Sequence, residues 1–170
     1  MIQSKYKHVI IAVPAAFVAM QGAHAANDGT ETTADIRQPV TVTKAADLDF
    51  GTFIPGTATS IFRINPRNGN MTQRSGDAIA FGGTPTPASF DVTGTAGLRV
   101  QITRNQNRIF ITRDGGTESM RINRFTYDRR RKRLNAAGEA NFAVGGQIRI
   151  RPNQAAGTYR GTFGVTVEYQ

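Results

Sequence analysis

Two groups of charged residues in this sequence have a spacing that could support chemistry. In the first, Asp47 and Asp49 alternate with Leu48 and Phe50, so a strand here places both carboxylates on one face. Neighbouring carboxylates can bind calcium or act as an acid and base pair. The alternative, which we favour, is that they form the solvent face of a strand whose other face carries Leu48 and Phe50.

The second group is a run of five adjacent cations, Arg129, Arg130, Arg131, Lys132 and Arg133. Like charges this close repel one another and cannot share a core, so the run predicts an exposed loop or strand tip. Nucleic acid is not the expected partner, because no aromatic residues are interleaved for base stacking and the amino terminus predicts export. An anionic cell-surface polymer or a lipid headgroup fits better, and a solvated loop without a partner is the simpler alternative.

The first 25 residues have the pattern of a secretory signal peptide. Lys5, Lys7 and His8 are basic, residues 9–20 are apolar, and Ala23-His24-Ala25 is a small-x-small cleavage site. The apolar run is shorter than the roughly 20 residues of a membrane-spanning helix. We therefore expect cleavage and export to the periplasm, the cell surface or the medium, with no transmembrane segment in the mature chain.

Removal of this segment limits the chemistry of the mature chain. The chain of 170 residues has no cysteine, and its two histidines, His8 and His24, both leave with the segment. The 19 Lys and Arg that remain against 12 Asp and Glu give a formal charge of +7. Without His or Cys, Ser-His-Asp triads, Cys-His pairs and the usual zinc sites are excluded. We expect no enzymatic activity, no cofactor and no disulfide.

The remaining sequence predicts a polar extension at residues 26–35 and a single domain at residues 36–170. Short alternating segments separated by Gly, Pro and Asn turns favour an all-β antiparallel sandwich, with a closed barrel as the alternative. Pro39 marks an edge strand at residues 36–42, and Leu48 and Phe50 mark a short strand. The other strands are expected at residues 60–65, 88–93, 97–104, 108–113, 119–127, 139–144, 147–151 and 157–169.

The last of these segments has the clearest alternation. Its apolar positions, which period two places on one face, are Tyr159, Phe163, Val165, Val167 and Tyr169. Thr and Arg occupy most of the intervening positions. A strand with one apolar and one polar face must cover a core on one side.

This segment also resembles the carboxy-terminal motif of pilus subunits that assemble by the chaperone–usher route. The shared features are a penultimate tyrosine, Tyr169, an alternating apolar row before it, and Gly157 as the fourteenth residue from the carboxyl end. The resemblance implies an Ig-like, pilin-like sandwich that is completed by a strand from a chaperone or a like subunit. It assigns partner contacts to Gly157, Tyr159, Phe163, Val165, Val167 and Tyr169.

A second resemblance covers more of the chain, roughly residues 36–170. The segment Leu48-Asp-Phe-Gly-Thr52 is similar to the opening of spore-coat-U-like secreted domains. It is still more similar to the secreted family called domain of unknown function 4402, which shares Val144-Gly-Gly146 and the Gly-Thr-Tyr-x-Gly-Thr ending.

Two functions therefore remain open. The first is a structural surface protein, a fimbrial subunit or accessory. The second is a monomeric secreted or periplasmic binding module for anionic glycans or other surface polymers. In the first case Ile36, Val40 and Val42 are the candidate donor residues, because residues 26–35 are almost without apolar side chains.

We predict that the exported protein begins at Ala26, because signal peptidase cleaves after a small-x-small site. Intact-mass measurement of protein recovered outside the cytoplasm checks this. Retention of residues 1–25 would contradict it.

Overall fold

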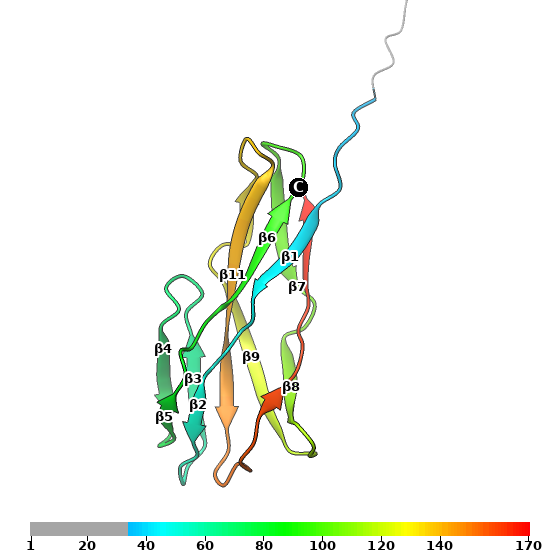
Figure 1. Ribbon diagram of the computed structural model, residues 1–170. Coiled ribbons are helices and arrows are strands. Elements are labelled where there is room, and N and C mark those ends of the chain that lie inside the picture. Colours follow the sequence, from blue (N-terminus) through cyan, green and yellow to red (C-terminus); the bar gives the residue numbers. More distant parts are fainter. Residues whose placement is uncertain (1–33) are drawn as a thin grey trace, which may run out of the picture. The chain divides into compact units, whose positions relative to one another are not determined.

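The computed structural model describes residues 34–170 (Figure 1). The expected signal peptide at residues 1–25 lies outside the described residues, as does most of the polar extension at residues 26–35. Residues 34–170 form strands and no α-helix, so none of them lies in a helix with the length and hydropathy to cross a membrane.

The described residues form three antiparallel sheets. The largest contains β1 (Thr41–Ala46), β3 (Ser60–Ile64), β4 (Met71–Ser75), β6 (Ala88–Thr93), β8 (Arg108–Arg113), β9 (Ser119–Tyr127), β11 (Glu139–Ile150) and β12 (Tyr159–Arg160). The second contains β7 (Arg99–Arg104), β10 (Arg131–Arg133) and β13 (Val165–Tyr169). The third pairs β2 (Thr52–Ile54) with β5 (Ile79–Gly82). The predicted all-β antiparallel sandwich is confirmed.

Part of the strand order of the two main sheets matches the immunoglobulin pattern, in which strands A-B-E-D face strands C-F-G, and β3, β4, β8, β10 and β12 are additional to it. The order β1-β6-β11-β9 corresponds to A-B-E-D, and the pair β7-β13 corresponds to C-F. In that pattern a last strand, G, pairs with the free edge of F. Within residues 34–170, β13 is the last strand and pairs with β7 alone, so position G carries no strand.

β11 is the central strand of the large sheet. On one edge it pairs first with β6 and then with β3, and on the other edge it pairs with β9. The prediction of two strands at residues 139–144 and 147–151 with a turn between them is therefore wrong. Gly145 and Gly146 are not a turn but the point where β11 changes partners, and the pairing with β9 shifts register there.

The carboxy-terminal segment is two strands rather than the single strand predicted at residues 157–169. β12 pairs with β8 in the large sheet, and β13 pairs with β7 in the small sheet, so the chain crosses between sheets at residues 161–164. Gly161 permits this crossing, because a Cβ there would lie 2.8 Å from Ile111 Cγ2 and 3.0 Å from the oxygen of Phe110. The alternation persists because both strands face the same core.

Other differences have local causes. The strand predicted at residues 36–42 begins only at Thr41, after Pro39, which has no amide to donate. The strand expected at Leu48 and Phe50 is an isolated bridge, in which Asp49 and Thr86 exchange two backbone hydrogen bonds of 2.9 Å. Prediction missed β2, β4, β5 and β10 because they are short, polar, or without clear alternation.

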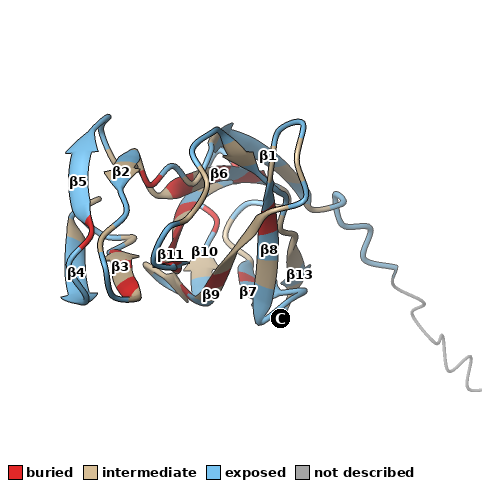
Figure 2. Ribbon diagram, turned by 90° about the horizontal axis from the view of Figure 1, so that it is seen from below, coloured by how far each residue is buried: buried red, intermediate tan, exposed pale blue. Residues whose placement is uncertain are grey.

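Residues Ile36–Gln170 form one unit around a hydrophobic core. Figure 2 shows buried segments on β6, β8, β9 and β11. The rings of Phe90 and Phe142 stack with centroids 5.0 Å apart, as do those of Phe125 and Phe163. The largest fully buried apolar side chains of the described residues are Phe142, Ile64, Ile102, Leu134, Ile150, Val92, Val100 and Val144.

We expect Gly145→Ala to lower the free energy of unfolding by about 1–3 kcal/mol, the usual effect of overpacking. A Cβ at this position would collide with the carbonyl oxygen of Ile64 and lie 2.9 Å from Pro66 Cδ. The matched control is Gly82→Ala in β5, where a Cβ meets no atom within 4 Å, and its effect should stay within about 0.5 kcal/mol. Urea unfolding followed by circular dichroism measures both, and equal losses would contradict the role given to Gly145.

Candidate functional site

The free edge of β13 is the first candidate site. The amide of Asn105 donates to the carbonyl of Gly164 (3.2 Å), and the amide of Gln170 donates to the carbonyl of Arg99 (3.0 Å). Because backbone groups alternate between the two edges of a strand, the even-numbered residues of β13 face β7. The backbone groups of Val165, Val167 and Tyr169 therefore point to the open edge.

The side chains of this edge face the core without being fully covered. Phe163, Val165 and Val167 are half-buried and pack against core residues. The ring of Phe163 stacks on Phe125 and meets the edge of Phe90 at a centroid distance of 6.2 Å. An apolar row that contacts the core but remains half-exposed is a surface on which another apolar strand can pack.

Tyr169 joins this edge to two distant segments. Its hydroxyl donates to the carbonyl of Gln38 (2.7 Å) and accepts the amide of Thr95 (2.6 Å). The amide of Gln38 in turn donates to the hydroxyl of Thr95 (2.9 Å). The penultimate tyrosine thus holds the chain that precedes β1 next to the carboxy-terminal strand.

Gly157 and Tyr159, the two remaining residues of the carboxy-terminal motif, have local roles at the start of the segment at residues 157–169. Tyr159 lies on β12, where its hydroxyl donates to the carbonyl of Ala155 (2.7 Å) and accepts from Gln154 Nε2 (2.9 Å). Gly157 has φ of 144°, and a Cβ there would lie 2.8 Å from Arg113 Cδ. Neither residue is on β13, so the structure does not bring them to its open edge.

The basic run is the second candidate site, and its five cations do not share one surface. Arg129 and Arg130 are exposed, whereas Arg131, Lys132 and Arg133 form β10, which pairs with β7. Arg129, Arg130, Arg131 and Arg133 are exposed as predicted, but residues 131–133 form a strand rather than a loop or strand tip. The side chain of Lys132 is mostly buried, with 18% exposed, and its ammonium forms an ion pair with Asp128 (2.7 Å). Pairing with β7 makes a strand of this polar segment because it supplies backbone hydrogen bonds.

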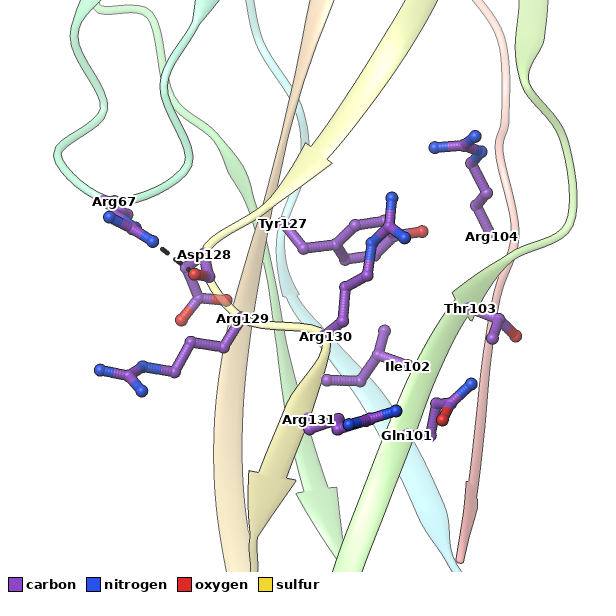
Figure 3. Close-up of a pocket in the computed structure, with 10 residues that line it drawn as sticks. All are labelled: Arg67, Gln101, Ile102, Thr103, Arg104, Tyr127, Asp128, Arg129, Arg130 and Arg131. Carbon is purple, nitrogen blue, oxygen red and sulfur yellow. Dashed lines mark hydrogen bonds between the residues drawn. The ribbon is translucent and has the colours of Figure 1, made fainter. Parts of the chain in front are cut away.

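A cleft of about 670 Å³ lies between this segment and β7 (Figure 3). Its charged lining consists of Arg67, Arg104, Arg129, Arg130, Arg131 and Asp128. None of these five arginines forms an ion pair within residues 34–170. The sequence could not predict that Arg67 and Arg104 line this cleft, because they lie in the β3–β4 turn and at the end of β7, outside the basic run.

Tyr127 lies in this cleft with a buried hydroxyl that has no hydrogen-bond partner in the described part of the chain. Burial raises the pKa of this hydroxyl, while the nearby charges of Arg104 and Arg130 act in the opposite direction. Figure 3 shows the guanidinium of Arg130 beside the tyrosine ring. An anionic group in the cleft could therefore meet both guanidinium and hydroxyl donors.

Asp128, the one carboxylate of the cleft, is already engaged. Burial alone would raise its pKa, but hydrogen bonds from Lys132 (2.7 Å) and from the amide of Ala143 (3.0 Å) hold the pKa of Asp128 below its ordinary value. It stays ionised and neutralises Lys132 rather than the arginines. The cleft consequently keeps an excess of positive charge.

The carboxylates of Asp47 and Asp49 are not brought together as a site. Asp47 pairs with the ammonium of Lys44 (2.6 Å), and Asp49 accepts the amide of Gly51 (2.8 Å). In residues 34–170 no three His, Cys, Asp or Glu side chains gather as a metal site would require.

Comparison with protein families matches residues 40–169 to the family described as a domain of unknown function (DUF4402). The chain belongs to this family. Comparisons with curated proteins and with solved structures found no match. The matched range of the DUF4402 domain includes every strand of both main sheets, the open edge of β13 and the basic cleft.

We expect Tyr169→Phe to lower the free energy of unfolding of the DUF4402 domain by about 1–2 kcal/mol, because the amide of Thr95 and the carbonyl of Gln38 lose their partner. Glu168→Gln, on the same strand but exposed, is the control and should change it by less than about 0.5 kcal/mol. Thermal and urea unfolding measure both variants. A Tyr169→Phe protein as stable as the control would show that this link is not structural.

Proposed function

We propose that this DUF4402 domain is an exported structural protein of the cell surface, a fimbrial subunit or accessory, that binds an extended strand at the open edge of β13. The partner is a periplasmic chaperone or a like subunit. The observation that carries the proposal is the G position, which no strand of residues 34–170 occupies, beside a partly exposed apolar strand. The role requires neither catalysis nor a cofactor.

The physical support is that one added strand would satisfy two needs together. It would hydrogen-bond with the outward backbone groups of β13, and its alternate side chains would cover Phe163, Val165 and Val167. Each apolar side chain that becomes fully buried contributes about 1.5–3 kcal/mol. Several such contacts amount to a large part of the 5–15 kcal/mol by which a typical domain is stable.

The domain's own amino-terminal residues narrow the choice of donor. Val42 lies in β1, and Val40 also packs against the core, so both are used within the domain. Ile36, by contrast, is 94% exposed. A donor that includes Val40 and Val42 would have to leave its own sheet, and a strand from a chaperone or from another part of a second copy is therefore the better candidate.

The proposal predicts that Val167→Pro blocks strand binding while the domain still folds. Proline removes an amide that points to the open edge, and edge strands tolerate proline when that amide faces solvent. Thr166→Pro is the control, because its amide faces β7 and its loss should disrupt the domain itself. Size-exclusion chromatography with light scattering, on protein produced with and without a strand-donating periplasmic chaperone, measures complex formation.

Wild-type protein should form a complex with the chaperone or assemble with itself, and Val167→Pro should do neither. A wild-type protein that refolds reversibly as a monomer, and binds neither the chaperone nor a second copy of itself, would contradict the proposal.

A second candidate function is a monomeric secreted or periplasmic binding module for anionic glycans. The observation that favours it is the basic cleft, which is lined by five arginines and by Tyr127, whose buried hydroxyl has no hydrogen-bond partner among residues 34–170. Its volume of about 670 Å³ lies within the usual range for small-ligand sites. Such a cleft would bind one short anionic group rather than a long chain.

A further inference from the structure

The outer face of the large sheet carries a second concentration of positive charge, formed by arginines outside the basic run. Cross-strand pairing aligns Phe110 with Arg121, and Arg121 with Arg149. The next row aligns Arg108 with Asn123, Asn123 with Gln147, and Gln147 with Arg63. We define the arginine face as Arg63, Arg108, Arg121, Arg149 and Arg151.

The arginine face has no internal compensation. Its five guanidinium groups form no ion pair within residues 34–170 and donate no hydrogen bond there. Where β3, β8, β9 and β11 pair with one another, the outward positions carry no carboxylate: they are Ile61, Arg63, Arg108, Phe110, Thr112, Ser119, Arg121, Asn123, Gln147 and Arg149. The exposed carboxylates Asp91 and Glu139 lie farther along the sheet, where β11 pairs with β6. The opposite side of the same strands is the core.

Two arginines of the face stand directly opposite each other on neighbouring strands. Arg121 and Arg149 are cross-strand partners, and strands lie only about 4.8 Å apart. Like charges in this position destabilise a sheet. An anion that binds between them therefore removes a repulsion as well as forming new contacts.

A small pocket of about 100 Å³, called the dent below, lies at the Arg121–Arg149 pair. It is lined by Phe110, Arg121, Arg149 and Arg151. The Nε atom of Arg121 is buried and has no hydrogen-bond partner among the described residues. A buried guanidinium donor without an acceptor is costly unless an acceptor can reach it. The dent has the size for one oxyanion group, with two further guanidinium groups at its rim.

We propose that the arginine face binds a linear anionic polysaccharide through sulfate or phosphate esters, with one ester in the dent beside Arg121. Tetrahedral oxyanions accept paired hydrogen bonds from guanidinium groups. The rows at Arg121 and Arg108 offer further cations to the neighbouring esters of the same chain. This binding function is additional to strand complementation and does not depend on it.

An anionic bilayer is the other partner that a cationic sheet face could meet, and the geometry favours the polymer. The donor at Arg121 is recessed, so a narrow chain that projects an ester can reach it more readily than a planar layer of headgroups. Phe110 is the one large apolar side chain that is strongly exposed on this face, at 54%. Membrane-surface binding generally uses a larger apolar area.

The experiment compares two double variants with the same loss of charge. Arg149→Ser with Arg151→Ser changes the arginine face, and Arg129→Ser with Arg130→Ser changes the basic cleft. All four side chains are exposed, so both proteins should fold. Binding of a long heparin-derived oligosaccharide is measured by calorimetry over a range of salt concentrations, with a phosphatidylglycerol vesicle as the lipid probe.

At low salt we expect the face variant to bind the oligosaccharide at least about tenfold more weakly. The slope of the logarithm of its binding constant against the logarithm of the salt concentration should become shallower by about one unit per arginine removed. The cleft variant should lose markedly less. Equal losses would show that only net charge matters, and a greater loss in the cleft variant would assign the polymer to the cleft. Binding to vesicles but not to the oligosaccharide would identify a lipid surface. Each of these three results overturns the proposal.

Discussion

The constraint on which this fold depends is the change of partner within β11. One strand of twelve residues must hydrogen-bond with β6 and then β3 along one edge, while β9 occupies the other. Glycine at positions 145 and 146 permits this, because a Cβ on Gly145 would collide with Ile64 and one on Gly146 would lie 3.2 Å from Leu48 Cδ2. The core residues of both halves of the large sheet are placed by this one strand.

The small sheet has an open edge within the described residues. β7 lies between β10 and β13, and β13 has no further neighbour within residues 34–170. Two kinds of contact stabilise that edge from within the domain: the stacking of Phe163 on Phe125, and the hydrogen bonds of the Tyr169 hydroxyl. They fix the position of β13 but leave its outward backbone groups available, which is the physical basis of the proposed strand complementation.

Positive charge is distributed over two surfaces with different geometries. The basic cleft is concave and combines arginines from three segments with a buried tyrosine hydroxyl. The arginine face lies on the outside of the sheet and is formed by pairing across four strands. Its arginines are single residues spaced along the chain, so cross-strand register brings together charges that no sequence run contains.

The sequence by itself determined the fold class and most strands of the core. Alternation at Val100 and Ile102, or at Ile148 and Ile150, required one buried face whatever the partner strand, and all four side chains are buried. The apolar row of the carboxyl end was identified in the same way, because a period of two depends only on the local backbone.

Tertiary structure alone decided which strands are neighbours. The double glycine at 145–146 has the composition of a turn, and only the approach of Ile64 makes it a register shift within a strand. Likewise, β10 is a strand because β7 supplies its hydrogen bonds, although its own side chains are all cationic. The cleft and the arginine face arise for the same reason: local sequence fixes the side to which a residue points, and long-range pairing fixes what lies beside it.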